Sequence, residues 1–484
     1  MLKVLKAALV AAAMASGALA APALAGPHED ALAATRAGDH AAAIAIWRPL
    51  AEKGDPRAQS NLGVMHENGR GVPADLAEAV RLYKLAAAQG YAPGQHNLGV
   101  MYANARGVAG DDAEAVKWYR LAADQGYAAG QADLGFMYEF GRGVKQDYAE
   151  AARLYRLAAD QGNGNARSNL GTLYRQGLGV AKDEAEAVKW YRLAAEQGHA
   201  GGQNNLGVML RDAMGTARDD AEALKWFRLS AAQGSAWART NLAEMYESGL
   251  GVERDYAEAA KWYRLAAEEG YPTAESALGV LYEEGRGVAQ DYAEAMRWYR
   301  RAAAKNDARA QSNIGYMYEM GRGVPKDEAE AVKWYRYAAD QHYAVAQTNL
   351  ALLYEEGRGV AKDEAEALKW YRRAAAQGDS AAQNNIGFMY EEGRGVPRDY
   401  AEAMRWYMKA AAQEDAVALY NIGSLHQEGH GVPRDLVRAL MWFELAAARG
   451  DKDAEAERAR LEKELTPAQV AEARRLAADW KPPK

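Results

Sequence analysis

The chain of 484 residues is long enough for two or three ordinary domains or for one long repeat array. Its formal net charge of −7 and isoelectric point of about 5.8 argue against a nucleic-acid binder, which needs clustered Lys and Arg. Cysteine is absent, which excludes disulfides, thiolate catalysis and a lipid-bearing cysteine behind a leader.

Residues 1–25 have the pattern of a secretory signal peptide. Lys3 and Lys6 precede an apolar stretch, Ala7 to Leu19, that is too short to span a bilayer. Two small-x-small sites follow and end at Ala20 and Ala25, so cleavage is expected near one of them. No later stretch is long and apolar enough for a membrane span. We therefore expect export, with the bacterial periplasm as the first expectation and release from the cell as the alternative.

A period of 36 residues runs from residue 28 to residue 450 and predicts about twelve units. Asn-Leu-Gly or a close variant recurs at this spacing from Asn61 to Asn421, and an aspartate recurs without exception from Asp75 to Asp435. The expected units lie near residues 28–55, 57–90, 93–126, 129–162, 165–198, 201–234, 237–270, 273–306, 309–342, 345–378, 381–414 and 417–450. Together they make an expected repeat domain over residues 26–450.

Each unit has the pattern of a helix, a tight turn and a second helix. In one copy, Ala310, Ile314 and Met317 are spaced for one buried face of the first helix. Gly321 is placed to end that helix in the left-handed conformation, and Asp327 is placed to cap the next one. The second helix directs small and aromatic residues toward its neighbours: Ala331, Trp334, Tyr335, Ala338 and Ala339. No unit can bury these faces alone, so the units must stack.

The recurring pattern Ala-x3-Leu/Ile-Gly-x2-Tyr, Gly-x-Gly-Val-x2-Asp, Ala-x2-Trp-Tyr, Ala-Ala-x2-Gly resembles the Sel1-like repeat, a relative of the tetratricopeptide repeat. Residues 381–414 match it nearly throughout. The resemblance implies an all-α fold, a right-handed superhelical solenoid with its first helices on the concave face. It also implies adaptor or regulatory roles, often in bacterial envelopes or signalling complexes.

Residues 451–484 break the period and are expected to form capping helices and a frayed tail. Thr466 and Pro467 have the pattern of a helix start, with a hydroxyl cap and Pro in the first turn. Four residues of that helix are expected to cover the final repeat: Val470, Ala473, Ala477 and Trp480.

Comparison of the copies within the chain separates structural positions from functional candidates. A residue kept in nearly every copy serves the stack, so the repeated Asn, the Gly-x-Gly turn and the repeated Trp are expected to be structural. No Ser is followed by Lys three positions later, and no Gly-x-Ser-x-Gly occurs, which disfavours a β-lactam or cell-wall hydrolase. His426 and His430 straddle a helix end without a His-Glu-x-x-His motif. We therefore expect no catalytic residue, no metal and no cofactor.

Charge varies at the positions that the tetratricopeptide register assigns to the concave groove. The two groove positions near the end of the first helix are acidic in the second half of the chain: Glu247, Glu283, Glu284, Glu319, Glu355, Glu356, Glu391, Glu392 and Glu428. The first half is mixed and includes Arg175 and Arg211. Two interpretations remain open. The acids pair with the loop arginines Arg286, Arg322, Arg358 and Arg394, or they form an acidic trough for a basic partner.

Apolar residues also break the pattern at groove positions: Phe136, Phe140, Tyr316, Met320, Phe388 and Tyr420. They are candidate anchors for a helix or an extended segment of a partner, or they only fill a narrow superhelix.

The unit that begins at Asn205 is irregular and is followed by further departures. Leu210 replaces the usual Tyr, Trp237 occupies a groove position, and Glu244 replaces an apolar residue. Sequence drift and a bend or partner site near residues 208–247 both remain open.

These observations predict a non-catalytic scaffold or adaptor of the cell envelope that binds a protein or peptide through the concave face. The partner is expected to be basic or to carry an apolar anchor. A periplasmic regulatory subunit of a signalling receptor is the narrower alternative, and a hydrolase is the disfavoured one.

Overall fold

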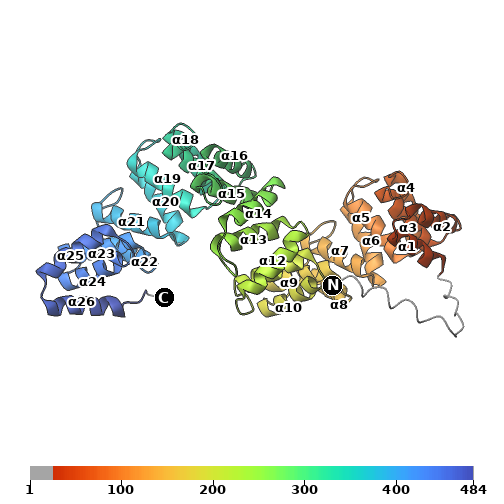
Figure 1. Cartoon of the computed structure of the whole chain (residues 1–484), viewed down its shortest axis with the longest axis horizontal. Coiled ribbons are helices and arrows are strands. Elements are labelled where there is room, and N and C mark those ends of the chain that lie inside the picture. Colours follow the sequence, from red (N-terminus) through yellow and green to blue (C-terminus); the bar gives the residue numbers. More distant parts are fainter. Residues whose placement is uncertain (1–25, 483–484) are drawn as a thin grey trace, which may run out of the picture. The chain divides into compact units, whose positions relative to one another are not determined.

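The computed structural model describes residues 26–482, so the predicted signal peptide and the end of the tail lie outside the described residues. The described residues form 26 α-helices and no strand (Figure 1). Contacts divide the chain into two compact units, one ending at Gln233 and the other beginning at Gly234. This boundary falls inside the irregular stretch 208–247. Within residues 26–482, no helix is long and apolar enough to cross a membrane.

The first unit consists of six helix pairs. They are α1 (Pro27–Arg36) with α2 (His40–Glu52), α3 (Pro56–Asn68) with α4 (Leu76–Ala88), α5 (Ala92–Ala103) with α6 (Asp112–Asp124), α7 (Ala128–Phe140) with α8 (Tyr148–Asp160), α9 (Gly164–Gln176) with α10 (Glu184–Glu196), and α11 (Ala200–Arg211) with α12 (Asp220–Ala232). Neighbouring first helices contact one another directly, as α3 with α5, α5 with α7 and α9 with α11. The first helices therefore lie side by side within the runs α3–α5–α7 and α9–α11.

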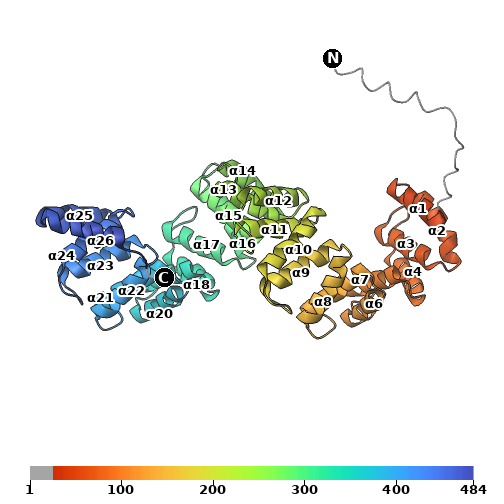
Figure 2. The ribbon, with the colours of Figure 1, turned by 90° about the horizontal axis from the view of Figure 1, so that it is seen from below.

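The second unit consists of six further pairs and a cap. The pairs are α13 (Ala236–Ser248) with α14 (Tyr256–Glu268), α15 (Pro272–Glu284) with α16 (Tyr292–Ala303), α17 (Ala308–Met320) with α18 (Glu328–Asp340), α19 (Ala344–Glu356) with α20 (Glu364–Ala376), α21 (Ser380–Glu392) with α22 (Tyr400–Ala411), and α23 (Ala416–Glu428) with α24 (Leu436–Ala447). The cap is α25 (Lys452–Glu464) and α26 (Pro467–Asp479). The predicted all-α solenoid of about twelve units is confirmed. Figure 2 shows the same succession of helix pairs from below.

The predicted turn chemistry is present in the pair α17 and α18. Gly321 ends α17 with a φ of 69°, in the left-handed region that glycine tolerates. The Asp327 carboxylate starts α18 by accepting a hydrogen bond of 2.9 Å from the Glu330 backbone N–H. The Glu330 side chain binds Lys333 and Trp334. The cap thus stabilises the helix start through one bond.

The second glycine of each turn joins successive repeats. Gly359 has a φ of 66°, and a Cβ atom on it would lie 2.2 Å from the Glu328 carbonyl oxygen of the preceding repeat. Only glycine leaves room for this approach. The turn between α19 and α20 therefore rests directly on the start of α18.

Small residues bring the helices of each pair close together around a buried aromatic side chain. A Cβ atom on Gly315 would lie 2.8 Å from the Tyr335 ring, and Tyr335 is completely buried. Ala331 and Ala338 of the same helix are also completely buried. The aromatic and alanine-rich core expected from the repeat is confirmed.

The C-terminal helices α25 and α26 pack on the last repeat. Thr466 and Gln469 form a reciprocal capping box at the start of α26. Ala473 is fully buried, and the Trp480 ring lies 5.5 Å from the Trp442 ring, centroid to centroid. Val470, Leu476 and Ala477 pack partly buried against the same cluster. The cap therefore buries the apolar side that a further repeat would otherwise cover.

Candidate functional site: the exposed face of the first helices

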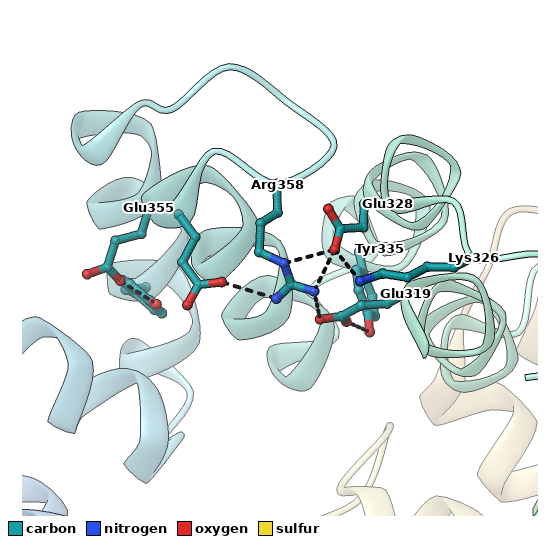
Figure 3. Close-up of polar contacts among 8 residues, drawn as sticks. Glu319, Lys326, Glu328, Tyr335, Glu355 and Arg358 are labelled. Carbon is teal, nitrogen blue, oxygen red and sulfur yellow. Dashed lines mark hydrogen bonds and ion pairs between the residues drawn. The ribbon is translucent and has the colours of Figure 1, made fainter. Parts of the chain in front are cut away.

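In seven of the described repeats, the glutamate at the first of the two acidic positions near the end of the first helix has a partner inside its own repeat. In the pair α17 and α18, the buried Tyr335 hydroxyl donates a hydrogen bond of 2.8 Å to Glu319 (Figure 3). The same bond recurs at a spacing of 16 residues: Tyr83–Glu67, Tyr155–Glu139, Tyr263–Glu247, Tyr299–Glu283, Tyr371–Glu355 and Tyr407–Glu391. Burial and the Glu319 charge raise the pKa of Tyr335, so its hydroxyl stays protonated and donates.

An arginine from the turn of the following repeat completes this contact in four repeats. Arg358 lies 3.0 Å from Glu319 and 3.0 Å from Glu328, and Lys326 approaches Glu328 from the other side (Figure 3). The other three pairs are Arg106–Glu67, Arg322–Glu283 and Arg394–Glu355. Each Tyr–Glu–Arg triad thus links the two helices of one repeat to the turn of the next. For Glu67, Glu283, Glu319 and Glu355, the structure therefore shows pairing with turn arginines, which was one of the two open interpretations.

Three of the tyrosine-bound glutamates lack this arginine contact, and for two of them the turn carries no arginine at the position. The position 39 residues after Glu139 is Leu178, and the position 39 residues after Glu391 is His430. Burial raises the pKa of both carboxyl groups, and for Glu391 the neighbouring charges of Glu392 and Glu428 raise it further. Burial thus makes these two carboxylates harder to ionise, and no arginine offsets it.

The second acidic position faces solvent more than the first. Glu284 pairs with Arg286 at 3.0 Å, Glu356 with Arg358 at 3.1 Å, and Glu428 with His430 at 2.9 Å. Glu392 is exposed. Since exposed pairs of this kind stabilise a fold by only about 0–1 kcal/mol, these carboxylates can exchange their partners for those of a bound protein. The outer acids, rather than Glu247, Glu283, Glu319, Glu355 and Glu391, are the acidic groups available on this face.

Among the predicted anchors, Phe136 and Phe140 form an exposed pair at the end of α7. The ring centroids lie 4.6 Å apart, with 37% of Phe136 and 56% of Phe140 exposed. In the next repeat the same two positions hold Thr172 and Gln176. The pair therefore presents aromatic surface that the repeat does not need for stacking.

The other predicted apolar anchors differ in exposure. Met320 is 50% exposed at the end of α17. Tyr316 and Phe388 are half-buried beneath turn arginines, with Arg322 5.1 Å and Arg394 4.8 Å from the ring centroids. Tyr420 is half-buried with its ring 5.4 Å from Phe443. Part of the surface of each of these three rings is covered by other residues of the same repeat, which agrees with a role in filling the space between helices.

In the irregular stretch, the loss of the tyrosine at position 210 is compensated by a new ion pair, whereas Trp237 is left exposed. Leu210 is buried in the usual tyrosine position, and Arg192, whose equivalents donate to that tyrosine, instead pairs with Glu222 at 2.6 Å. Arg211 lies over the Phe227 ring and pairs with Asp212 at 2.7 Å. Trp237 is 65% exposed with its ring 4.5 Å from Tyr271, and Glu244 is half-buried. Arg175 is half-buried beside Tyr191.

The two histidines occupy separate surroundings. His426 is buried, and burial together with Arg438 lowers its pKa. His430 stacks on Tyr400 with a centroid distance of 4.5 Å. Among residues 26–482, no group of three or more His, Asp and Glu side chains is placed to hold a metal ion.

The repeated Asn binds polar side chains of a neighbouring first helix. Asn97 donates to the Ser60 hydroxyl at 3.3 Å, and Asn421 donates to Asn384 at 2.9 Å. These contacts join neighbouring first helices, so the residue aligns one repeat on the next.

A family model for the Sel1 repeat matches eleven segments: residues 56–91, 92–127, 128–163, 164–199, 200–235, 238–271, 272–307, 308–343, 344–379, 380–415 and 416–451. The chain belongs to the Sel1 repeat family. The pair α1 and α2 precedes the matched Sel1 repeats and supplies the twelfth, degenerate unit. Sel1 repeats are typically protein-interaction modules and are generally non-catalytic.

Solved structures of other Sel1 repeat proteins resemble this chain. A protective antigen present in uropathogenic Escherichia coli strains, with the Sel1-like repeat fold, is 37% identical, covers 90% of this chain and 93% of its own, and superposes with a TM-score of 0.67. A Sel1 repeat protein from Oxalobacter formigenes is 33% identical over 64% of this chain and 89% of its own, with a TM-score of 0.47. No curated protein matches the chain.

Proposed function

We propose that this Sel1 repeat protein is an exported, non-catalytic adaptor that binds a protein or peptide through the exposed face of its first helices. The Phe136–Phe140 pair is the observation that carries the proposal. Two adjacent, solvent-exposed phenylalanines on a rigid helix have the chemistry of interface anchors, because their burial by a partner removes apolar surface from water without ordering a flexible chain.

In the second unit, the outer acids offer polar contacts to a partner. Glu284, Glu356, Glu392 and Glu428 lie at the corresponding helix ends of the second unit. A partner with Lys or Arg at its rim would compete with Arg286, Arg358 and His430 for these carboxylates. Such rim charges act mainly on association rate and partner choice. A basic partner is therefore favoured, with an apolar group as its anchor.

Affinity capture with matched variants tests the first-helix proposal. The variant Phe136→Thr/Phe140→Gln carries the residues of the next Sel1 repeat and should keep the fold. Tyr337→Leu is the control, because Tyr337 is an exposed aromatic residue on a second helix, where most repeats carry Leu. The tagged wild type and the control should recover the same partner from cell extract, and the double variant at least about tenfold less. Equal recovery by all three proteins would overturn the proposal.

Export is the second part of the proposal and rests on the pattern of residues 1–25. The 37% identical E. coli relative is a protective antigen. An antigen of that kind is accessible to a host's defences, which supports an exported location for a protein of similar architecture. N-terminal sequencing of the protein purified from its host should find a start at Ala21 or Gly26. A chain that keeps Met1 and remains in the cytoplasm would overturn this part.

A regulatory subunit of a signalling receptor would be one case of such an adaptor. Identification of the captured partner decides between this case and a general scaffold.

A further inference from the structure

Two pockets with equivalent linings lie 72 residues, or two repeats, apart in the first unit. One has a volume of about 510 Å³ between α2, α3 and α4, and the other about 500 Å³ between α6, α7 and α8. Four equivalent pairs of lining residues matter here: Arg48 and Arg120, Glu78 and Glu150, Leu82 and Leu154, Leu85 and Leu157. We call the pockets the Leu82 socket and the Leu154 socket.

A leucine replaces the repeated tryptophan in both sockets. The other nine Sel1 repeats carry Trp at this position of the second helix: Trp118, Trp190, Trp226, Trp262, Trp298, Trp334, Trp370, Trp406 and Trp442. Leu82 and Leu154 are themselves buried and pack in the clusters that include the preceding second helix. Replacing an indole by the smaller leucine removes ring volume from a closely packed position, which accounts for a pocket at the same place in both repeats.

The neighbouring repeat shows how an indole is held at this position. The Trp190 Nε1–H donates a hydrogen bond of 3.0 Å to Glu186. The Arg156 guanidinium lies 5.4 Å from the centroid of the same ring. Glu186 corresponds to Glu78 and Glu150, and Arg156 corresponds to Arg48 and Arg120. Both sockets therefore keep the acceptor and the cation of an indole site but lack the indole.

We propose that each socket receives a tryptophan side chain from a partner polypeptide. The ring lies against the leucine and beneath Arg48 or Arg120, and the indole N–H donates to Glu78 or Glu150. A cation over the face of an indole attracts the ring electrostatically and stabilises such a contact. The carboxylates already have one partner each, since Arg81 and Arg153 bind them through two hydrogen bonds. Glu186 likewise binds Lys189 and Trp190 together, so a second donor is compatible with the site.

An apolar stripe beside the sockets favours a polypeptide over a free small molecule. Five leucines at the same position of successive second helices are each 40–46% exposed: Leu85, Leu121, Leu157, Leu193 and Leu229. Leu85 and Leu157 also line the sockets, so the stripe joins them with Leu121 in between. In the second unit the position changes after Leu265 to Arg301, Tyr337, Arg373 and Lys409. Leu265 at the same position is also 43% exposed. Exposed leucines repeated at one position of successive second helices are typical of a protein contact surface.

Methyl NMR of leucine-labelled, full-length mature protein tests the proposal with the blocked peptide acetyl-Gly-Trp-Gly-amide as probe. The peptide should cause saturable shifts at the Leu82, Leu85, Leu154 and Leu157 methyl groups. Leu154→Trp restores the residue of most repeats and should abolish the response at that socket only, and Leu82→Trp should do the same at the other. Glu150→Gln, or a probe methylated on the indole nitrogen, should bind the Leu154 socket at least about threefold more weakly.

Three results would overturn the proposal. The first is the absence of saturable shifts up to the solubility of the peptide. The second is a response that persists unchanged in the Leu82→Trp/Leu154→Trp variant. The third is much tighter binding of free tryptophan than of the blocked peptide, because that would identify a small-molecule site. If either tryptophan variant fails to fold, the Glu150→Gln and N-methyl measurements still decide.

Discussion

Tyr335 donates its phenolic hydrogen to Glu319 across 2.8 Å, and the two residues belong to the two helices of one Sel1 repeat. Arg358 of the next repeat binds the same carboxylate. A buried carboxylate is stable only when its acceptor sites are occupied, so the three side chains act as one unit. The contact explains why acids persist at a helix end, where the helix dipole disfavours them.

Removing one member of the triad should loosen the local helix pair. Tyr335→Phe removes the donor and should lower the free energy of local opening of α17 and α18 by about 1–2 kcal/mol. Hydrogen exchange of peptides from these helices measures the change, since 1.4 kcal/mol corresponds to about tenfold in exchange rate. The corresponding peptides of α9 and α10 should change less in Tyr191→Phe, because Tyr191 bonds Thr172 instead of a carboxylate. Equal effects in both variants would show that the carboxylate adds nothing.

Substitution of two glycines, Gly359 and Gly378, distinguishes the cost of the left-handed backbone conformation from the cost of disturbing the packing between repeats. Gly359 and Gly378 both have positive φ values, 66° and 90°, but only Gly359 faces backbone of the preceding repeat. Gly378→Ala should therefore carry only the cost of the left-handed conformation, roughly 1 kcal/mol. Gly359→Ala should be at least about 1 kcal/mol more destabilising by thermal unfolding, because the turn must move away from α18. Equal losses of stability would contradict the tight seating of the turn.

The raised pKa of Glu391, which has no arginine partner, predicts how the stability of its repeat depends on pH. Because the pKa of Glu391 is raised above its ordinary value of 4.5, the folded state binds this proton more tightly than the unfolded chain. The ionised group therefore lowers stability above the folded-state pKa, and this penalty disappears as the pH falls toward 4.5. Glu391→Gln should slow hydrogen exchange of α21 and α22 at pH 7, and the difference from wild type should shrink on acidification.

Glu319→Gln is the matched control for this pH effect, since Glu319 has both Tyr335 and Arg358 as partners. It should speed exchange of α17 and α18 at pH 7. Faster exchange of α21 and α22 in Glu391→Gln would show that the Glu391 carboxylate is a net stabilising group.

Much of this architecture could be predicted from the sequence because the repeat carries it locally. The 36-residue period gives the spacing of the helices, Gly321 marks the end of a first helix, and Asp327 marks the start of a second helix. The structure confirms both helix boundaries. The Tyr–Glu bond was missed because it joins residues 16 apart on different helices, which no helical periodicity links. One signal was available: Phe227 and Phe443 replace the tyrosine where Arg211 and Gln427 replace the glutamate.

The candidate surface was less predictable, because it too depends on contacts between residues far apart in the sequence. Position in the repeat identifies which residues lie near the groove, but exposure depends on what the neighbouring turn places over them. Phe388 and Phe136 occupy equivalent positions, yet Arg394 covers Phe388 while Phe136 remains exposed. The sequence shows Leu82 and Leu154 in place of the repeated tryptophan. Their interpretation as indole sites depends on the Glu and Arg side chains that the structure places beside them.

Absence of hydrolytic activity is a further expectation. The chain has neither Ser-x-x-Lys nor cysteine, and its recurring carboxylates are bound within the stack. Purified protein should therefore hydrolyse neither nitrocefin nor peptidoglycan above a heat-inactivated sample. Reproducible turnover that co-purifies with the protein would require a catalytic site and would contradict the adaptor interpretation.

Site-specific photo-crosslinking in the native host tests the central claim most directly. A benzoylphenylalanine at position 140, beside Phe136, should yield a discrete covalent adduct with one partner. The same residue at position 369, an exposed lysine on a second helix of the other unit, should yield none. An adduct at 140 that disappears in Phe136→Thr is the predicted result. No adduct at 140, or the same adduct from 369, would contradict binding through the first helices.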